Sequence, residues 1–231
     1  MSIDYSRRGS YSGGCRLNRV VGFSLLPQYG MKVLSQRAIP EAYRLQVDEI
    51  WEKREPHHFN GQILSLRSYS PSLLVVDVVD YRAWYACVRE PSLQRALDIH
   101  PLSVSGRVIC DGKILIGRRS QHVSSFKGCL ECCPSGSVAP EAGTPEKAIR
   151  AELSEETKGS SIRKIIPKAV YWSLDDGAWD VHMDIVCDRV DLVPTKEYEE
   201  LFWFDPKEKK KDLGKWVPLS KHLVQLAIEY D

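Results

Sequence analysis

Three glutamates lie close together near the middle of the chain, where Glu152 is followed by Glu155 and Glu156. At spacings of three and four residues, the three side chains fall within one arc of about 100° on a helix. Neighbouring like charges repel each other by roughly a few tenths of a kcal/mol per pair. Three carboxylates on one face offer hard oxygen ligands to Mg²⁺ or Mn²⁺, which would relieve that repulsion. On spacing alone, a solvated acidic face remains the simpler interpretation.

The segment before the glutamates carries the signals of a helix start. Thr144 can serve as N-cap, Pro145 suits the first helical position, and Glu146 places an acid in the first turn. Ile149 and Leu153 lie on the arc next to the glutamates and supply apolar contacts with a core. We therefore predict a helix that a glycine-containing loop leads into and that one apolar stripe anchors.

The stretch from Pro134 to Gly159, "PSGSVAPEAGTPEKAIRAELSEETKG", resembles the Nudix box, Gly-x5-Glu-x7-Arg-Glu-U-x-Glu-Glu-x-Gly-U with U aliphatic. "ELSEET" matches the catalytic half of that pattern. The resemblance extends more loosely over residues 101–231, through "ILIGRRS", "CPSGSV" and an acidic stretch that runs into Trp203. It implies an α/β fold, a Nudix-type α/β/α sandwich with a mixed sheet.

The resemblance also implies a function and a set of site residues. Nudix hydrolases hold divalent metal ions against a diphosphate, and water then cleaves a nucleoside diphosphate from another moiety. Carried over by position, Glu152, Glu155 and Glu156 are the metal-binding and catalytic residues, and Gly136 is the first glycine of the box. The implied cofactor is Mg²⁺, with Mn²⁺ as the alternative ion, and the implied partner is a small-molecule nucleotide.

Several positions depart from the box. Its arginine falls at Ala151 and its late glycine at Lys158, with Gly159 one place further on. Arg150 cannot replace the arginine, because it points about 160° away from the first glutamate of the trio. The loop is one residue longer than the pattern, so Glu141 only approximates the first glutamate of the box. An active pyrophosphatase and a weak or inactive module that binds a nucleotide or a protein therefore both remain open.

A diphosphate substrate needs cations, and Arg118, Arg119 and Lys127 are the candidates beside Gly136. Because side chains alternate along a strand, only one of the two arginines can point inward. Ordinary solubility at a strand end is the alternative role for the pair. The proton acceptor is an acid chosen from the following set: Glu156, Glu197, Glu199 and Glu200.

The group attached to the nucleoside diphosphate is less constrained. A tryptophan-bearing helix, "HFNG", "DYRAW" and "PLSVSG" are similar to the branch that cleaves UDP-glucose, so a UDP-sugar is the first choice and ADP-ribose or a dinucleotide the next. Four aromatic residues could stack on a base or pack in the core. They are Phe126, Trp172, Trp179 and Trp203. His122 and His182 are candidates for acid-base chemistry, although single histidines in loops and strands seldom have that role.

Element signals divide the chain into a flexible leader over 1–37, a small α+β extension over 38–100 and the Nudix-like domain over 101–231. In the extension we expect one helix over 39–54 and strands over 62–69 and 72–88. In the last part, Asp111-Gly112 predicts a hairpin turn. Strands over 168–176, 179–193 and 200–205 and a helix over 219–230 complete the predicted domain.

Composition excludes several classes of protein. With 32 basic and 31 acidic residues, the net charge of +1 gives no electrostatic argument for nucleic-acid binding. No apolar run reaches the length of about 20 residues needed to cross a membrane. Seven cysteines without regular spacing predict reduced thiols and a cytoplasmic protein, with organelle import through the leader as the alternative. A homodimer through the extension is a further expectation.

Overall fold

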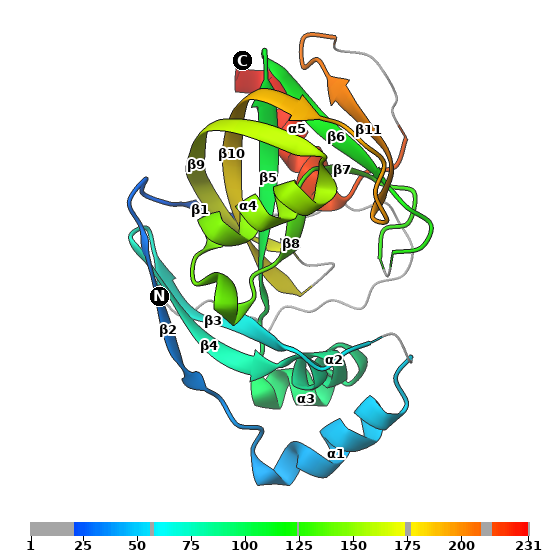
Figure 1. Cartoon of the computed structure of the whole chain (residues 1–231). Coiled ribbons are helices and arrows are strands. Elements are labelled where there is room, and N and C mark those ends of the chain that lie inside the picture. Colours follow the sequence, from blue (N-terminus) through cyan, green and yellow to red (C-terminus); the bar gives the residue numbers. More distant parts are fainter. Residues whose placement is uncertain (1–20, 56–57, 124, 174–176, 209–213, 231) are drawn as a thin grey trace.

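The computed structural model describes residues 21–55, 58–123, 125–173, 177–208 and 214–230 (Figure 1). Its larger sheet has eight strands, of which β7 (Leu130–Cys132) pairs with β6 and β8 (Ser135–Ser137) pairs with β5. The other six follow the order β1 (Val21–Ser24), β9 (Gly159–Ser173), β10 (Ala178–Asp191), β5 (Leu102–Cys110), β6 (Lys113–Arg119) and β11 (Tyr198–Phe204). The sheet is mixed, because β10 and β5 are parallel while the other neighbours are antiparallel.

Two helices cover opposite faces of this sheet. Helix α4 (Pro145–Glu156), preceded by the 3-10 turn η1 (Pro140–Ala142), lies on one face, and α5 (Pro218–Tyr230) lies on the other (Figure 1). Alternation along β6 sorts its side chains between them: Leu115 joins the core under α4, and its neighbour Ile116 joins the core under α5. The expected α/β/α sandwich with a mixed sheet is therefore confirmed.

The hairpin predicted at Asp111-Gly112 is also confirmed. It joins β5 to β6, and both of its residues have positive φ, 49° at Asp111 and 75° at Gly112. A two-residue turn with this twist suits Asp-Gly, since glycine adopts positive φ without steric cost.

The N-terminal part carries a second, three-stranded sheet of order β2 (Gly30–Gln36), β4 (Leu73–Asp80) and β3 (Gln62–Ser70). Helices α1 (Glu41–Glu52), α2 (Tyr81–Arg89) and α3 (Pro91–Leu97) pack beneath it (Figure 1). The helix expected over 39–54 is found, with Pro40 as its N-cap residue. Ala83, Ala86 and Cys87 of α2 are buried in the small core of this part.

Two expectations for the N-terminal part are wrong. The strand expected over 72–88 ends at Asp80, and residues 81–89 form α2. Apolar residues on both faces of α2 produce a run that a buried strand would also show. Irregular structure was expected up to residue 37, yet β1 and β2 lie within 21–36. The rest of the predicted leader, residues 1–20, lies outside the described residues.

The main hydrophobic core spans both parts. Leu64 and Leu66 of β3 belong to the same buried cluster as Val104 of β5 and Ile149 of α4. Strand β1 also crosses over to the larger sheet, where Val21 lies opposite Trp172 and Ser24 opposite Ala169. The N-terminal part therefore covers one side of the following domain. No helix among the described residues is long and apolar enough to span a membrane.

Candidate functional site

Helix α4 begins where the sequence predicts. Thr144 is the N-cap, and its Oγ1 accepts a hydrogen bond of 3.2 Å from the backbone N–H of Lys147. Pro145 follows at the first helical position. Ile149 and Leu153 are fully buried and hold one side of the helix against the sheet. This packing fixes the direction in which the three glutamates of the last two turns project.

The three glutamates lie in three different environments. Glu156 is 3% exposed, and its Oε2 accepts a hydrogen bond of 2.9 Å from the Cys133 thiol. Its Oε1 accepts a longer one, 3.4 Å, from the backbone N–H of Ser135. Glu152 is half-buried and Glu155 is exposed. The trio thus runs from the interior to the solvent along one side of α4.

Gly136 forms part of the wall against which Glu152 lies. It sits in β8, opposite Val104 of β5, and faces α4. A Cβ added at Gly136 would overlap the carboxyl group of Glu152, whose Oε1, Cδ and Oε2 are its three nearest atoms. Only glycine therefore lets the carboxylate approach this strand so closely.

A fourth carboxylate, Glu131, belongs to the same cluster and was not identified from the sequence. It is 7% exposed on β7. Its Oε2 forms an ion pair with Arg119 Nη1 and accepts a hydrogen bond of 3.1 Å from the Tyr198 hydroxyl. Its Oε1 accepts one of 3.0 Å from the Ser135 hydroxyl. The one available signal was a charged residue inside a short buried strand.

Glu197 is the later acid that reaches the cluster. Burial is the main cause that raises its pKa, Arg119 lowers it, and Glu131 and Glu155 raise it further. Glu200, by contrast, pairs with Arg118 across the β6–β11 ladder at 3.0 Å. The sequence left several acids open as proton acceptors. Among Glu197, Glu199 and Glu200, the raised pKa of Glu197 and its interaction with Glu131 and Glu155 single it out.

Burial and, after it, the charges of neighbouring acids raise the pKa of two helix glutamates. Burial, followed by the charges of Glu155 and Glu197, raises the pKa of Glu152 to about 7. Burial raises the pKa of Glu156 well above its ordinary value, and Glu131 adds to this effect while the Cys133 hydrogen bond opposes it. Arg119 is the cation that the structure places within the cluster. Among the described residues, this site thus gathers more acidic side chains than cations.

The donor set fits a hard divalent cation in chemistry, since it consists of carboxylate oxygens that repel one another. In this structure the acidic side chains do not surround a single point. Among the described residues, no group of three or more His, Cys, Asp or Glu side chains is close enough to hold an ion. Glu155 is exposed and Glu152 half-buried, so their carboxylates can turn on the rigid helix. Glu152, Glu155 and Glu156 are the residues that would hold the metal.

The predicted phosphate-binding cations are placed as follows. Arg119 forms an ion pair with Glu131, and its Nε donates a hydrogen bond to the carbonyl oxygen of Ser125. Arg118 points the other way and pairs with Glu200. The structure thus separates the two arginines, as strand alternation requires. Lys127 is exposed on the loop between β6 and β7.

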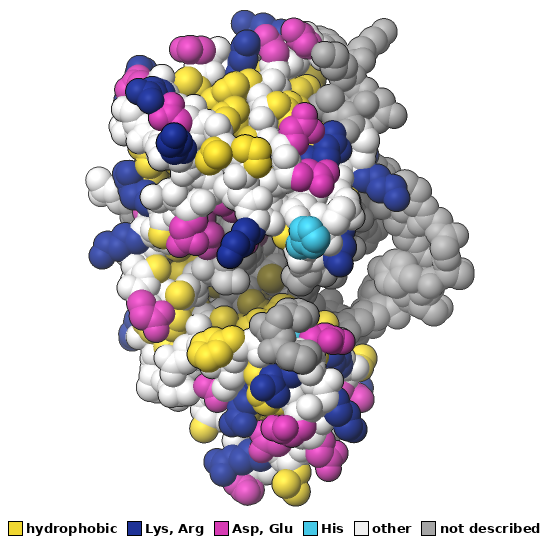
Figure 2. Space-filling model, turned by 45° about the vertical axis from the view of Figure 1, so that its right-hand side comes forward, with side chains coloured by type: hydrophobic (Ala, Val, Ile, Leu, Met, Phe, Trp, Pro, Cys, Tyr) yellow, Lys and Arg dark blue, Asp and Glu magenta, His cyan; other side chains and the backbone are white. Residues whose placement is uncertain are grey.

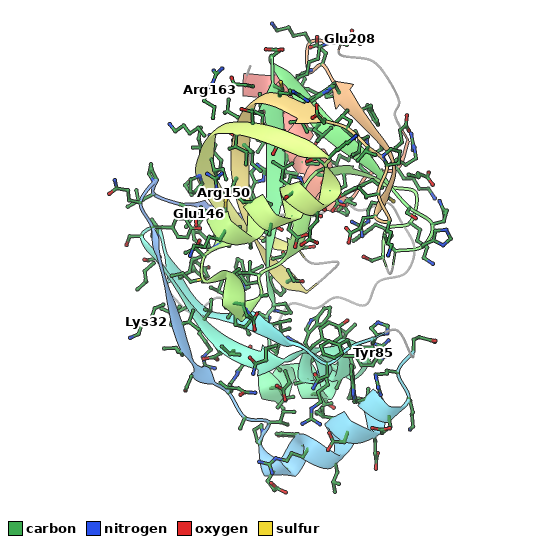
Figure 3. All side chains as sticks on the ribbon, in the orientation of Figure 1. Lys32, Tyr85, Glu146, Arg150, Arg163 and Glu208 are labelled. Carbon is green, nitrogen blue, oxygen red and sulfur yellow. The ribbon has the colours of Figure 1, made fainter. Side chains whose placement is uncertain are left out.

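The residues that depart from the Nudix pattern lie on the outer surface of the loop and helix. Ala151 and Lys158 are exposed, as is Glu141. Arg150 is exposed as well, and its charge acts on Cys187 of β10 rather than on the glutamates. In Figure 3, Arg150 and Glu146 are labelled on α4, where their spacing of four residues places them on the same face.

The aromatic and histidine candidates are mostly structural. Trp179 is 4% exposed and packs in the main core, with its ring 5.2 Å from that of Trp172. Trp203 packs against the same core, and Phe126 is half-buried with a φ of 51°. His182 is 2% exposed, and burial lowers its pKa to about 3, which removes it from proton transfer with solvent.

Two comparisons with known proteins give no match: no family model and no curated relative matches the chain. Solved structures do resemble it. A Nudix hydrolase from Nitrosomonas europaea is 17% identical, with a TM-score of 0.46, over 57% of this chain and 72% of that one. A Nudix-family hydrolase from Clostridium perfringens is 13% identical, with a TM-score of 0.42, over 56% and 97%.

A third structure is a bifunctional NMN adenylyltransferase/ADP-ribose pyrophosphatase from Francisella tularensis, 16% identical with a TM-score of 0.43. The match covers 57% of this chain and 41% of that protein. A second structure of the Francisella protein holds AMP and a manganese ion. Nudix hydrolases are thus among the solved structures that this chain resembles.

Proposed function

We propose that this protein is a divalent-metal-dependent hydrolase that cleaves the diphosphate bond between a nucleoside diphosphate and another moiety. The observation that carries the proposal is the carboxylate cluster formed by α4, β7 and the segment before β11. Burial and then the charges of neighbouring acids raise the pKa of Glu152 and Glu156, and Arg119 is the cation placed among them. A protein gains nothing in stability from such crowding, so a cationic ligand is its simplest purpose.

Each acid has a separate task in this proposal. When bound, Mg²⁺ or Mn²⁺ supplies a Lewis acid for the phosphoryl oxygens and lowers the pKa of an attacking water. Glu152 and Glu155 present oxygens from the accessible part of α4. Glu156 is held from behind by Cys133 and Ser135, so its carboxylate keeps one orientation. Glu131 and Arg119 brace the floor of the site.

Glu197 is the proposed proton acceptor. It is exposed at the edge of the cluster, and desolvation together with Glu131 and Glu155 raises its pKa above the ordinary value although Arg119 lowers it. Glu199 and Glu200 are exposed, and Glu200 is paired with Arg118. A base whose pKa lies nearer the working pH accepts a proton more effectively while it remains ionised. Lys127 is the proposed contact of the loop with the phosphate, because Arg119 is already engaged.

The substrate class follows from the sequence resemblance and not from the geometry. A UDP-sugar, UDP-glucose first, is the preferred substrate, and ADP-ribose or a dinucleotide comes next. The second candidate function is a catalytically weak module that binds a nucleotide or a protein. Ala151, Lys158 and the longer loop favour it, since they alter positions that brace the box.

A substrate panel separates the two functions. UDP-glucose, ADP-ribose and diadenosine polyphosphates are incubated with the wild-type protein, with and without Mg²⁺, and phosphate-containing products are measured. Glu155→Gln and Glu156→Gln should lose turnover while circular dichroism shows an unchanged fold. Glu199→Gln is the matched control and should keep it. Nucleotide binding without turnover in any metal would select the module instead.

A further inference from the structure

Tyr198, the first residue of β11, is fully buried, and its hydroxyl reaches into the carboxylate cluster. The hydroxyl donates a hydrogen bond of 3.1 Å to Oε2 of Glu131. Because no part of its ring meets solvent, Tyr198 acts on the site only through the acid that its hydroxyl contacts.

The ring of Tyr198 passes over Gly117 of β6, which has no side chain to block it. Gly117 lies opposite Glu131 in the β6–β7 ladder. Arg119, two residues further along β6, lies opposite Tyr198 in the β6–β11 ladder. Side chains two residues apart on a strand share a face, so the four positions lie on one face of the sheet. A Cβ added at Gly117 would come 2.4 Å from Tyr198 Cδ1, so only glycine lets the tyrosine reach across the strand.

The backbone at the start of β11 is held as well. Thr195 Oγ1 accepts hydrogen bonds of 3.2 Å from the backbone N–H groups of Glu197 and Tyr198. The backbone N–H of Thr195 donates to the carbonyl oxygen of Tyr198 at 3.0 Å. The carbonyl oxygen of Glu197 accepts a further hydrogen bond, of 2.6 Å, from the N–H of Ser120. Since ring and backbone are both fixed, the tyrosine hydroxyl has a defined position.

A chain of hydrogen bonds runs from this hydroxyl to helix α4. Glu131 accepts the tyrosine hydroxyl on Oε2, and its Oε1 accepts a hydrogen bond of 3.0 Å from the Ser135 hydroxyl. The backbone N–H of Ser135 then donates at 3.4 Å to Oε1 of Glu156. Linked hydrogen bonds inside a protein strengthen one another. The orientation of Glu131 therefore constrains Ser135, and Ser135 constrains Glu156.

Burial sets the acids of this chain apart from the surface charges. Figure 2 shows acidic and basic side chains interspersed over one face of the molecule, where solvent screens them. Glu131 and Glu156 are only 7% and 3% exposed, so protein donors replace water as their partners. Loss of one donor from the chain therefore disturbs a buried acid more than loss of a surface contact would.

We infer that Tyr198 is a positioning residue for the metal site. Through Glu131 and Ser135, it holds the Glu156 carboxylate in the orientation that receives a divalent cation. This inference rests on the proposed function, because it takes Glu156 to be a metal ligand. Tyr198 itself touches neither metal nor substrate. Groups that orient metal ligands typically contribute a factor of about 10–100 to metal affinity or activity.

The test measures metal binding apart from turnover, by calorimetric titration of the full chain with Mn²⁺. Tyr198→Phe removes the hydroxyl and keeps the ring that lies over Gly117. This variant should bind Mn²⁺ about tenfold more weakly or worse, because Glu131 loses one of its donors. Tyr85→Phe is the matched control, since it deletes a hydroxyl from another buried tyrosine, on α2, and should leave Mn²⁺ affinity unchanged.

A double variant separates positioning from a general loosening of the fold. Ser135→Ala removes the hydroxyl that joins Glu131 to the next member of the chain. In this background, Tyr198→Phe should lower Mn²⁺ affinity by less than about twofold more, because residues that act through one network are not additive. Losses that multiply would show that Tyr198 does not act through the chain, and would overturn the inference. If Tyr198→Phe does not fold, Ser135→Ala alone carries the test, and unchanged Mn²⁺ affinity would again overturn it.

The outcomes separate this inference from the proposed function. Weaker Mn²⁺ binding by Tyr198→Phe, without hydrolysis of any substrate by wild type, would support the inference and reject the hydrolase. Hydrolysis by wild type, with equal Mn²⁺ affinity in wild type and Tyr198→Phe, would overturn the inference alone. A wild-type protein that binds no Mn²⁺ would overturn both.

Discussion

The carboxyl group of Glu152 occupies the space that a side chain at Gly136 would fill. This relationship joins the first glycine of the loop to the first glutamate of the helix. It explains why a strand as short as β8 carries a glycine opposite α4. The backbone at Gly136 therefore forms one side of the site, and the Glu152 carboxylate lies directly against it.

Gly136→Ala should lower activity much more than stability. The new methyl group meets the end of a flexible side chain, so Glu152 moves aside and the fold remains. Displacing a residue that holds the metal is expected to lower metal affinity by about tenfold or more. Gly159→Ala is the control, since its nearest atom beyond its neighbours is 3.6 Å away. Calorimetric metal titration and thermal unfolding measure the two effects; equal metal affinity in Gly136→Ala and wild type would contradict the proposal.

Without metal, the protein should lose stability as the pH rises from about 4.5 toward 7. The pKa of Glu152 is raised from 4.5 to about 7 in the folded state. The folded state then binds more protons than the unfolded state in this window, so the free energy of unfolding falls with increasing pH. Glu152→Gln should flatten this dependence. Urea unfolding of wild type and Glu152→Gln at pH 5 and pH 7, with a chelator present, tests this prediction. An equal change in the free energy of unfolding between the two pH values in both proteins would contradict it.

Adding Mg²⁺ at pH 7 should restore the stability that is lost when these buried, closely spaced glutamates ionise. A ligand that binds the folded state alone stabilises it by mass action, in proportion to the logarithm of its concentration over the dissociation constant. Thermal unfolding of wild type should therefore shift upward with Mg²⁺ or Mn²⁺. Glu155→Gln should shift less, because one carboxylate is lost. Identical shifts in the two proteins would argue against the helix as the metal site.

Arg119 and Arg118 should differ sharply in their effect on stability. Arg119→Met leaves the Glu131 carboxylate buried without its cation, and breaking a buried ion pair costs about 3–5 kcal/mol. Arg118→Met removes an exposed pair with Glu200, which contributes roughly 1 kcal/mol at most. Chemical denaturation of both variants gives the comparison. Similar losses would mean that Glu131 does not depend on Arg119.

Glu197→Gln should lower kcat by about 10²–10⁴ while KM changes little, as removal of a general base does. Glu199→Gln, two residues away and exposed, is its control. In wild type, log kcat should rise with pH up to the raised pKa of Glu197, because the base must be ionised. If Glu197→Gln has the same pH profile and rate as wild type, the general base is a glutamate of helix α4 instead.

Local signals predicted the elements that they control. Thr144 and Pro145 define the start of α4, and Asp111-Gly112 defines the β5–β6 turn, because capping and positive φ depend on adjacent residues alone. Helix α2 was mistaken for strand, since aromatic and aliphatic residues follow one another along it where a surface helix would alternate with polar ones. The two faces become distinguishable only when tertiary contacts show which one is covered.

Contacts between distant residues explain what the sequence could not show about the site. Glu131 joins the cluster through Tyr198, which is 67 positions away in the chain. Spacing placed Glu152, Glu155 and Glu156 on one helix, but their different burial depends on β8 and on Cys133 and Ser135, which contact α4. A pattern on one helix identifies candidate ligands, whereas their protonation depends on the strands that surround them.

Two sets of contacts hold the N-terminal part to the rest of the chain: the pairing of β1 with β9 and the shared main core. A protease cut in the connection between α1 and β3 would therefore nick the protein without splitting it. A fragment that began at residue 101 would expose the backbone groups of β9 and invite aggregation. Supplying residues 21–100 as a separate polypeptide should rescue such a fragment by complementation.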